Sequence, residues 1–215
     1  RKLWTPLTKH GNIFETTTQH VAVKILNERG YRYSEVLIPF GDDLHIEDLR
    51  ARTITADGSV VEVTPERIFE VDLVPEHIFY SDTKAKKFTF PAVAPGAVIE
   101  YMYSTVSESI SLWGEFDFQR PEPVLSAQFS LDLPSPLTFV QVFHCPDYLP
   151  EAVQAKGRDP SAWVRRGGYR EKASSKIARK TYRYTLADLP PIAFEDQMPP
   201  PQQVGARLVY SSASF

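Results

Sequence analysis

The feature that most constrains the fold is a hydrophobic period of two that recurs along much of the chain. In PVLSAQFSLDLP (123–134), every second residue from Leu125 onward is apolar: Leu125, Ala127, Phe129, Leu131 and Leu133. Successive side chains of a β-strand point to opposite faces, so this pattern predicts a strand with one buried face. The 18 prolines and 12% aromatic residues suit short strands separated by turns. We therefore predict an all-β fold, an antiparallel β-sandwich of about ten strands with little or no helix.

Turn residues predict how neighbouring strands are joined. The alternating runs 21–26 and 31–40 are separated by a short polar loop, which predicts a hairpin. A second hairpin is predicted between the runs 44–55 and 59–63. The Asp57-Gly58 pair in its loop tolerates the positive φ angles that tight hairpin turns require.

The segment KKFTFPAVAPGAVIEYMY (86–103) places an acid, Glu100, in the most apolar strand of the chain. Pro91 ends one strand because proline cannot donate to a ladder, and Pro95-Gly96 predicts a type II turn before the next. A lone acid lacks a second group to divide acid and base roles, which favours a structural interpretation over catalysis. If Glu100 faces the interior, it needs an arginine or hydrogen-bond donors; if it faces solvent, it is an ordinary surface charge.

The segment LWGEFDFQRPEP (112–123) contains a candidate binding surface. At period two, one face carries four residues suited to ligand contacts: Trp113, Glu115, Asp117 and Gln119. Two carboxylates at i and i+2, about 7 Å apart, beside an aromatic ring are similar to sugar-handling surfaces. They lie side by side and do not flank a bond, which disfavours catalysis. Alternating polar residues are also typical of any solvent-facing strand, so both interpretations stay open.

Charge is distributed unevenly. Residues 164–183 carry eight Lys or Arg and one Glu, a charge of +7, which leaves −10 on the rest of a chain of net charge −3. The predicted basic hairpin includes Arg165, Arg166 and Arg170 as candidate binding residues for an anionic partner. The alternative is a solvated sheet edge whose charge prevents aggregation.

Several function classes receive no support from the sequence. The single cysteine, Cys145, excludes an internal disulfide, and on a strand it points away from its neighbour His144, which excludes a Cys-His pair. The five histidines are scattered without metal-ligand spacing, and no apolar run is long enough for a membrane span. We therefore expect no catalytic residue, no metal, no cofactor and no nucleic-acid partner.

The predicted organisation has four parts. Residues 1–11 form a leading segment without the features of a signal peptide, and residues 12–189 form the β-sandwich. The Pro-rich segment 190–205 is expected to be an extended linker. Residues 206–215 are expected to start a strand or a following domain, as in one module of a longer protein.

Five segments of the chain carry a family resemblance: VKILNERGYRYSEVLIPF, ARTITADGSVVEV, KKFTFPAVAPGAVIEYMY, WGEFDFQRPEPV and LPPIAFEDQMPP. Together they resemble a bacterial domain-of-unknown-function family that lies immediately N-terminal to transglutaminase-like (papain-fold) domains, and the resemblance covers about residues 12–212. Its most specific positions are Phe90, Pro91, Pro95, Gly96, Ile99, Glu100 and Tyr101. The family implies a β-sandwich with no assigned activity, in exported or periplasmic proteins.

Three functional hypotheses follow. The resemblance implies a non-catalytic accessory module that positions or recruits substrate for a neighbouring transglutaminase-like domain, whose Cys-His-Asp residues have no counterpart in this chain. The second hypothesis is a carbohydrate or cell-wall binding module that uses Trp113 with Glu115 and Asp117, or the basic hairpin. The third, which the residues support least, is an independent hydrolase. In all three, Pro91, Pro95, Gly96 and Glu100 are expected to be structural.

Overall fold

The described strands show that the protein is all-β. The computed structural model describes residues 2–4, 15–73, 84–107, 114–134, 139–144, 151–157, 163–166, 169–172, 179–193, 196–200 and 204–212. This part of the chain contains sixteen β-strands together with short 3-10 helices, which confirms the predicted fold class. The strands outnumber the expected ten because very short ones, such as β1 (Lys2–Trp4) and β6 (Phe69–Asp72), show too little alternation to be recognised.

The chain divides into two compact units where one sandwich over residues 12–189 was expected. The continuous unit is Thr17–Glu108, and the discontinuous unit combines Arg1–Thr16 with Ser109–Phe215. Apolar and polar residues alternate in the strands of both units, so this pattern does not indicate where one unit ends and the other begins.

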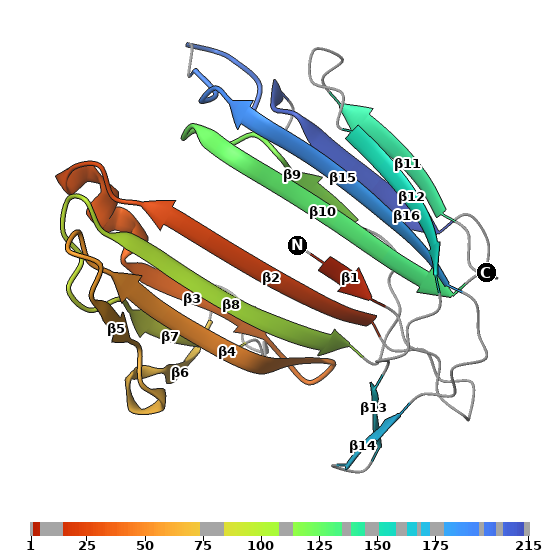
Figure 1. The fold of residues 1–215 in the computed structure, drawn as a ribbon, viewed down its shortest axis with the longest axis horizontal. Helices are drawn as coiled ribbons and strands as arrows, with labels where there is room; N and C mark the ends of the chain where they lie inside the picture. Colours follow the sequence, from red (N-terminus) through yellow and green to blue (C-terminus); the bar gives the residue numbers. More distant parts are fainter. Residues whose placement is uncertain are drawn as a thin grey trace. The chain divides into compact units, whose positions relative to one another are not determined.

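Two sheets make up the continuous unit (Figure 1). One has the strand order β2-β8-β4-β5 and the other β3-β7-β6. Their bounds are β2 (Glu15–Lys24), β3 (Glu35–Phe40), β4 (Leu44–Ile54), β5 (Val60–Glu62), β7 (Lys84–Thr89) and β8 (Val98–Ser107). Both sheets contribute to one core: Ile38 and Phe88 come from β3 and β7, and Ala51 and Ile99 come from β4 and β8. The unit is therefore a small sandwich.

The discontinuous unit is built in the same way. One sheet has the order β12-β15-β10-β1, and a second has the order β11-β16-β9. The bounds are β9 (Gly114–Asp117), β10 (Val124–Pro134), β11 (Phe139–His144), β12 (Glu151–Gly157), β15 (Arg179–Leu189) and β16 (Arg207–Ser212). β1 pairs parallel with β10, whereas β10 pairs antiparallel with β15.

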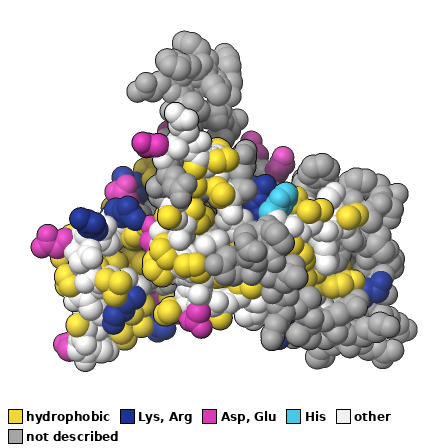
Figure 2. Space-filling view, turned by 90° about the horizontal axis from the view of Figure 1, so that it is seen from above, with side chains coloured by type: hydrophobic (Ala, Val, Ile, Leu, Met, Phe, Trp, Pro, Cys, Tyr) yellow, Lys and Arg dark blue, Asp and Glu magenta, His cyan; other side chains and the backbone are white. Residues whose placement is uncertain are grey.

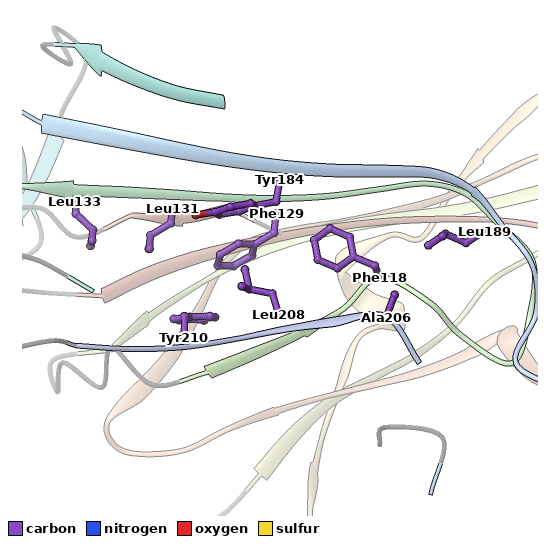
Figure 3. Packing of buried hydrophobic residues seen from close by; sticks show 9 residues of the cluster. All are labelled: Phe118, Phe129, Leu131, Leu133, Tyr184, Leu189, Ala206, Leu208 and Tyr210. Atoms are coloured by element: carbon purple, nitrogen blue, oxygen red, sulfur yellow. The ribbon is translucent and has the colours of Figure 1, made fainter. Parts of the chain in front are cut away.

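Aromatic and leucine side chains fill the core of this unit. Figure 3 shows Phe129, Leu131 and Tyr184 of β10 and β15 on one side and Leu208 and Tyr210 of β16 on the other. All five are at most 1% exposed. The predicted buried face of β10 is present from Phe129 onward, but Leu125 is 79% exposed, and near the start of the strand Val124 and Ala127 pack against the core instead.

Two of the predicted turns are confirmed. β4 and β5 form the expected hairpin, and Gly58 in its loop has φ +89°. Gly96 has φ +91°, and the Ala97 amide donates to the Ala94 carbonyl at 3.0 Å, as the predicted Pro95-Gly96 turn requires. A Cβ added at Gly96 would lie 3.0 Å from the Ala56 Cβ, which leaves no room for a larger side chain.

The hairpin predicted between residues 21–26 and 31–40 is wrong. β2 and β3 belong to different sheets and are joined by a 3-10 helix, η1 (Glu28–Tyr33). The Asn27 side chain accepts a hydrogen bond from the Arg29 amide at 3.0 Å and so caps this helix. Alternation identified both strands, but it carries no information about which strand pairs with which.

The last described strand is an inner strand of the discontinuous unit. The sequence predicted that residues 206–215 start a strand or a following domain; the strand is present as β16, and it lies between β11 and β9. The Pro-rich segment before it is hydrogen-bonded near its beginning, since the Ile192 amide donates to the Arg120 carbonyl at 2.9 Å. At its other end, the Phe118 amide donates to the Ala206 carbonyl at 2.9 Å.

Candidate functional site

The predicted acidic face is present on the short strand β9. Phe118 is buried and Phe116 packs against the core, whereas Glu115 and Asp117 lie on the opposite face. This division matches the period-two prediction for the segment. Trp113, the predicted aromatic platform, lies outside the described residues, so the proposed sugar-stacking ring has no structural description.

Arg207 lies next to both acids. It stands opposite Asp117 in the pairing of β16 with β9, and its Nη1 donates to Glu115 Oε2 at 3.1 Å. Its side chain is 17% exposed, and its Nε is buried without a hydrogen-bond partner among the described residues. The sequence analysis missed Arg207, because ninety residues separate it from Asp117 and only strand pairing brings them together.

The two acids differ in their electrostatic environment. Burial raises the pKa of Asp117 above its usual 3.8, and the nearby Glu115 carboxylate raises it further. Arg120 and Arg207 lower it, with smaller effects. Asp117 therefore retains its proton to a higher pH than an ordinary aspartate, while Glu115 is the acid that forms the ion pair.

Gln119, the fourth residue predicted on this face, uses its side-chain amide for hydrogen bonds within the protein. Its Nε2 donates to the Pro190 carbonyl at 2.9 Å, and its Oε1 accepts from the Ala206 amide at 3.2 Å. The side chain therefore connects the two ends of the segment between β15 and β16. This use of both its donor and its acceptor argues against a ligand contact by Gln119.

Glu100 has two charged or polar neighbours, one on each adjacent strand. Arg52 of β4 donates from Nε to Glu100 Oε2 at 2.6 Å, and His20 of β2 lies with Nε2 2.7 Å from Oε1. The Glu100 side chain is 21% exposed, and the Arg52 and His20 side chains are about half exposed. The cluster therefore lies on the partly solvated face of the sheet. The partner that the sequence left unidentified is an arginine together with a histidine.

Hydrogen bonding sets the protonation of Glu100. The bond from Arg52 lowers its pKa below the usual 4.5, the bond with His20 lowers it further, and partial burial opposes both. Glu100 is therefore a stable carboxylate at neutral pH. Figure 2 shows Lys, Arg, Asp and Glu side chains interspersed over the coloured part of the face in view, as expected for a surface of paired charges.

The described residues of the basic segment 164–183 belong to three strands. β13 (Trp163–Arg166) and β14 (Tyr169–Lys172) form a two-stranded antiparallel sheet, in which Arg165 is opposite Arg170. The part from Arg179 to Arg183 belongs to β15, which lies between β12 and β10. The interpretation of this part as a sheet edge is therefore wrong, because β15 is paired on both sides.

Among the described residues, no three His, Cys, Asp or Glu side chains are grouped as metal ligands. No helix in the same part of the chain has the length and apolar character needed to cross a membrane.

Comparison with known proteins identifies the family. A crystal structure of a "putative protease" from Parabacteroides distasonis has a similar fold, with a TM-score of 0.68 and 17% sequence identity. The match covers 98% of this chain and 39% of that protein, so the chain spans well under half of its length. The chain matches no curated protein sequence. The model of the domain of unknown function DUF3857 matches residues 15–193, and the chain therefore belongs to the DUF3857 family.

Proposed function

We propose that the chain is a non-catalytic accessory module of a larger transglutaminase-like protein, in which it positions or recruits a substrate or partner. The observation that carries the proposal is the coverage of the Parabacteroides distasonis protein, in which this fold accounts for 39% of the length. The remaining length has room for a separate catalytic domain. The proposal includes an exported or periplasmic location, which the family resemblance implies.

The acids that sequence analysis singled out support a non-catalytic role. Glu100 is paired with Arg52 and His20, and Glu115 is paired with Arg207. Asp117 lies on the same strand face as Glu115, so the two acids do not stand on opposite sides of a space that a scissile bond would occupy. Carbohydrate binding at this face has less support, because Arg207 and Gln119 are engaged by the protein itself.

The test uses the whole protein encoded by the gene that contains this sequence. We would compare it with a variant that lacks all of residues 1–215, so that both compact units are removed, and with the present chain alone, using a protein substrate and a small amide substrate. We expect no turnover by the chain alone. We expect the deletion to raise KM for the protein substrate by about tenfold or more and to leave turnover of the small amide unchanged.

Three outcomes would contradict the proposal. These are amide hydrolysis by the present chain alone, an unchanged KM for the protein substrate after the deletion, and a gene product without a transglutaminase-like region.

A further inference from the structure

The strand β11, at one end of the β11-β16-β9 sheet, presents two exposed valines. The Tyr184 hydroxyl donates to Gln141 Oε1, and Phe143 packs against the core, so these alternate positions face the interior of the unit. Successive side chains of a strand point to opposite faces. Val140 and Val142 therefore lie on the outer face, where they are 54% and 52% exposed.

The backbone along one side of β11 has no ladder within the described part of the chain. β11 pairs with β16 in continuous register over six residues, and β16 separates β11 from β9. The amide and carbonyl groups on the other side of β11 form a row that an extended segment can join by strand pairing. The geometry of this edge therefore fits an extended strand.

β11 also lacks the residues that oppose strand association. Charged residues and prolines at an exposed edge disfavour pairing with another chain. Between Phe139 and Phe143, β11 contains neither. Four other edge strands each carry at least one such residue: Pro39 in β3, Glu62 in β5, Glu70 in β6 and Glu115 in β9. The edge of β11 is therefore open to pairing in a way that these four are not.

The sequence of β11 is complementary to itself. Residues 139–143 read FVQVF, which is the same in both directions. In an antiparallel pair of two copies centred on Gln141, Val140 of each copy lies opposite Val142 of the other. A two-fold axis perpendicular to the sheet relates the two strands and keeps the outer face of both copies on the same side. The half-exposed valines would then form cross-strand pairs that bury apolar surface and place no charges opposite each other.

We propose that β11 pairs with β11 of a second copy of the chain, so that the three-stranded sheets of the two copies join across a two-fold axis. The other edge of this sheet, β9, carries Glu115 and Asp117 on its outer face, and like charges there oppose a further pairing step. The assembly therefore stops at two copies. This interaction goes beyond the accessory role proposed above and does not depend on it.

The first test measures the mass of the chain in solution by analytical ultracentrifugation over a range of concentrations. We expect a reversible equilibrium between one and two copies. Val142→Lys places a charge at the pairing edge and should raise the Kd of the dimer by about tenfold or more.

Val60→Lys is the matched control for this substitution. Val60 is 51% exposed on the edge strand β5, outside the proposed interface, so the same change is made at the same exposure. It should alter the Kd of the dimer by less than about twofold. Circular dichroism spectra and thermal melts compare the folding of each variant with that of the wild type. Val140→Lys tests the same edge if Val142→Lys changes the melt.

The second test uses disulfides to report the register. Directly opposed positions 140 and 142 of two copies have Cα atoms about 4.5–5.5 Å apart, which a disulfide spans. The same position in both copies forms a diagonal pair about 7–8 Å apart, which a disulfide does not span without distortion. Val140→Cys and Val142→Cys are made in chains that also carry Cys145→Ser. Their mixture should form a linked dimer under mild oxidation, and each variant alone should form much less.

Four outcomes would overturn the proposal. These are the mass of one copy at every concentration measured, assembly beyond two copies, equal weakening by Val142→Lys and Val60→Lys, and cross-linking of the cysteine mixture no greater than that of either variant alone.

Discussion

Glu100 in the continuous unit and Asp117 in the discontinuous unit are similar in sequence but opposite in electrostatics. Each is an acid on a strand whose alternate residues enter a core, and each stands opposite an arginine of the neighbouring strand, Arg52 or Arg207. Yet the pKa of Glu100 is lowered and that of Asp117 is raised. An arginine nearby is therefore not enough to determine the charge state of an acid.

The difference lies in what each arginine binds. Arg52 donates directly to Glu100, whereas Arg207 donates to Glu115 and leaves Asp117 with burial and a second negative charge. Hydrogen bonding to the ionised form dominates at Glu100, and desolvation dominates at Asp117. The comparison shows that burial, together with the charge of a second acid on the same face, raises the pKa of Asp117 although an arginine lies opposite it.

The largest expected effect concerns the turn before Glu100. Gly96→Val places a β-branched residue at φ +91° with its Cβ 3.0 Å from Ala56, and it should lower the free energy of unfolding by about 2–3 kcal/mol. Chemical denaturation measures this loss. If the turn also sets the alignment of β8, the Glu100 pKa measured by NMR should rise toward its usual value. A variant as stable as the wild type would show that the positive φ imposes no constraint.

The second prediction compares the two arginines. Arg207→Met removes the cation from between two acids at a side chain that is 17% exposed, and should cost about 2 kcal/mol of unfolding free energy. Arg52→Met affects a side chain that is 45% exposed and should cost about 1 kcal/mol or less. Urea denaturation of both variants at neutral pH checks the order. Equal losses would remove the proposed distinction between the two sites.

The smallest expected effects are changes in how the stability of the protein depends on pH, and they have opposite signs for Glu100 and Asp117. Because the folded pKa of Glu100 is lowered, its stabilising contribution is present above its usual pKa of 4.5 and is lost as pH falls through the folded value. Glu100→Gln should therefore destabilise the protein at pH 7 and lose this effect on acidification. Thermal melts of wild type and variant between neutral and acidic pH measure the convergence.

Asp117 should behave in the reverse sense. Its folded pKa is raised, so its favourable contribution is complete below its usual 3.8 and is lost as pH rises through the folded value. Asp117→Asn should therefore stabilise the protein slightly at pH 7 and make no difference below about pH 3.8. Thermal melts of wild type and Asp117→Asn between neutral and acidic pH measure this difference. Parallel pH profiles for the two variants would contradict the comparison.

The sequence was sufficient to predict those features of the structure that depend only on residues close together in the chain. The alternation of Glu115 and Asp117 with Phe116 and Phe118 predicted the two faces of β9, because side-chain direction in a strand depends only on position along it. The Gly96 turn was predictable because few residues accept its positive φ.

The sequence by itself therefore determined the all-β class, the two faces of β9 and the positions of the tight turns at Gly58 and Gly96. The tertiary structure decided the partners: Arg52 and His20 for Glu100, Arg207 for Glu115, and separate sheets for β2 and β3. The physical reason is that alternation arises within one strand, whereas pairing depends on contacts between segments far apart in the chain.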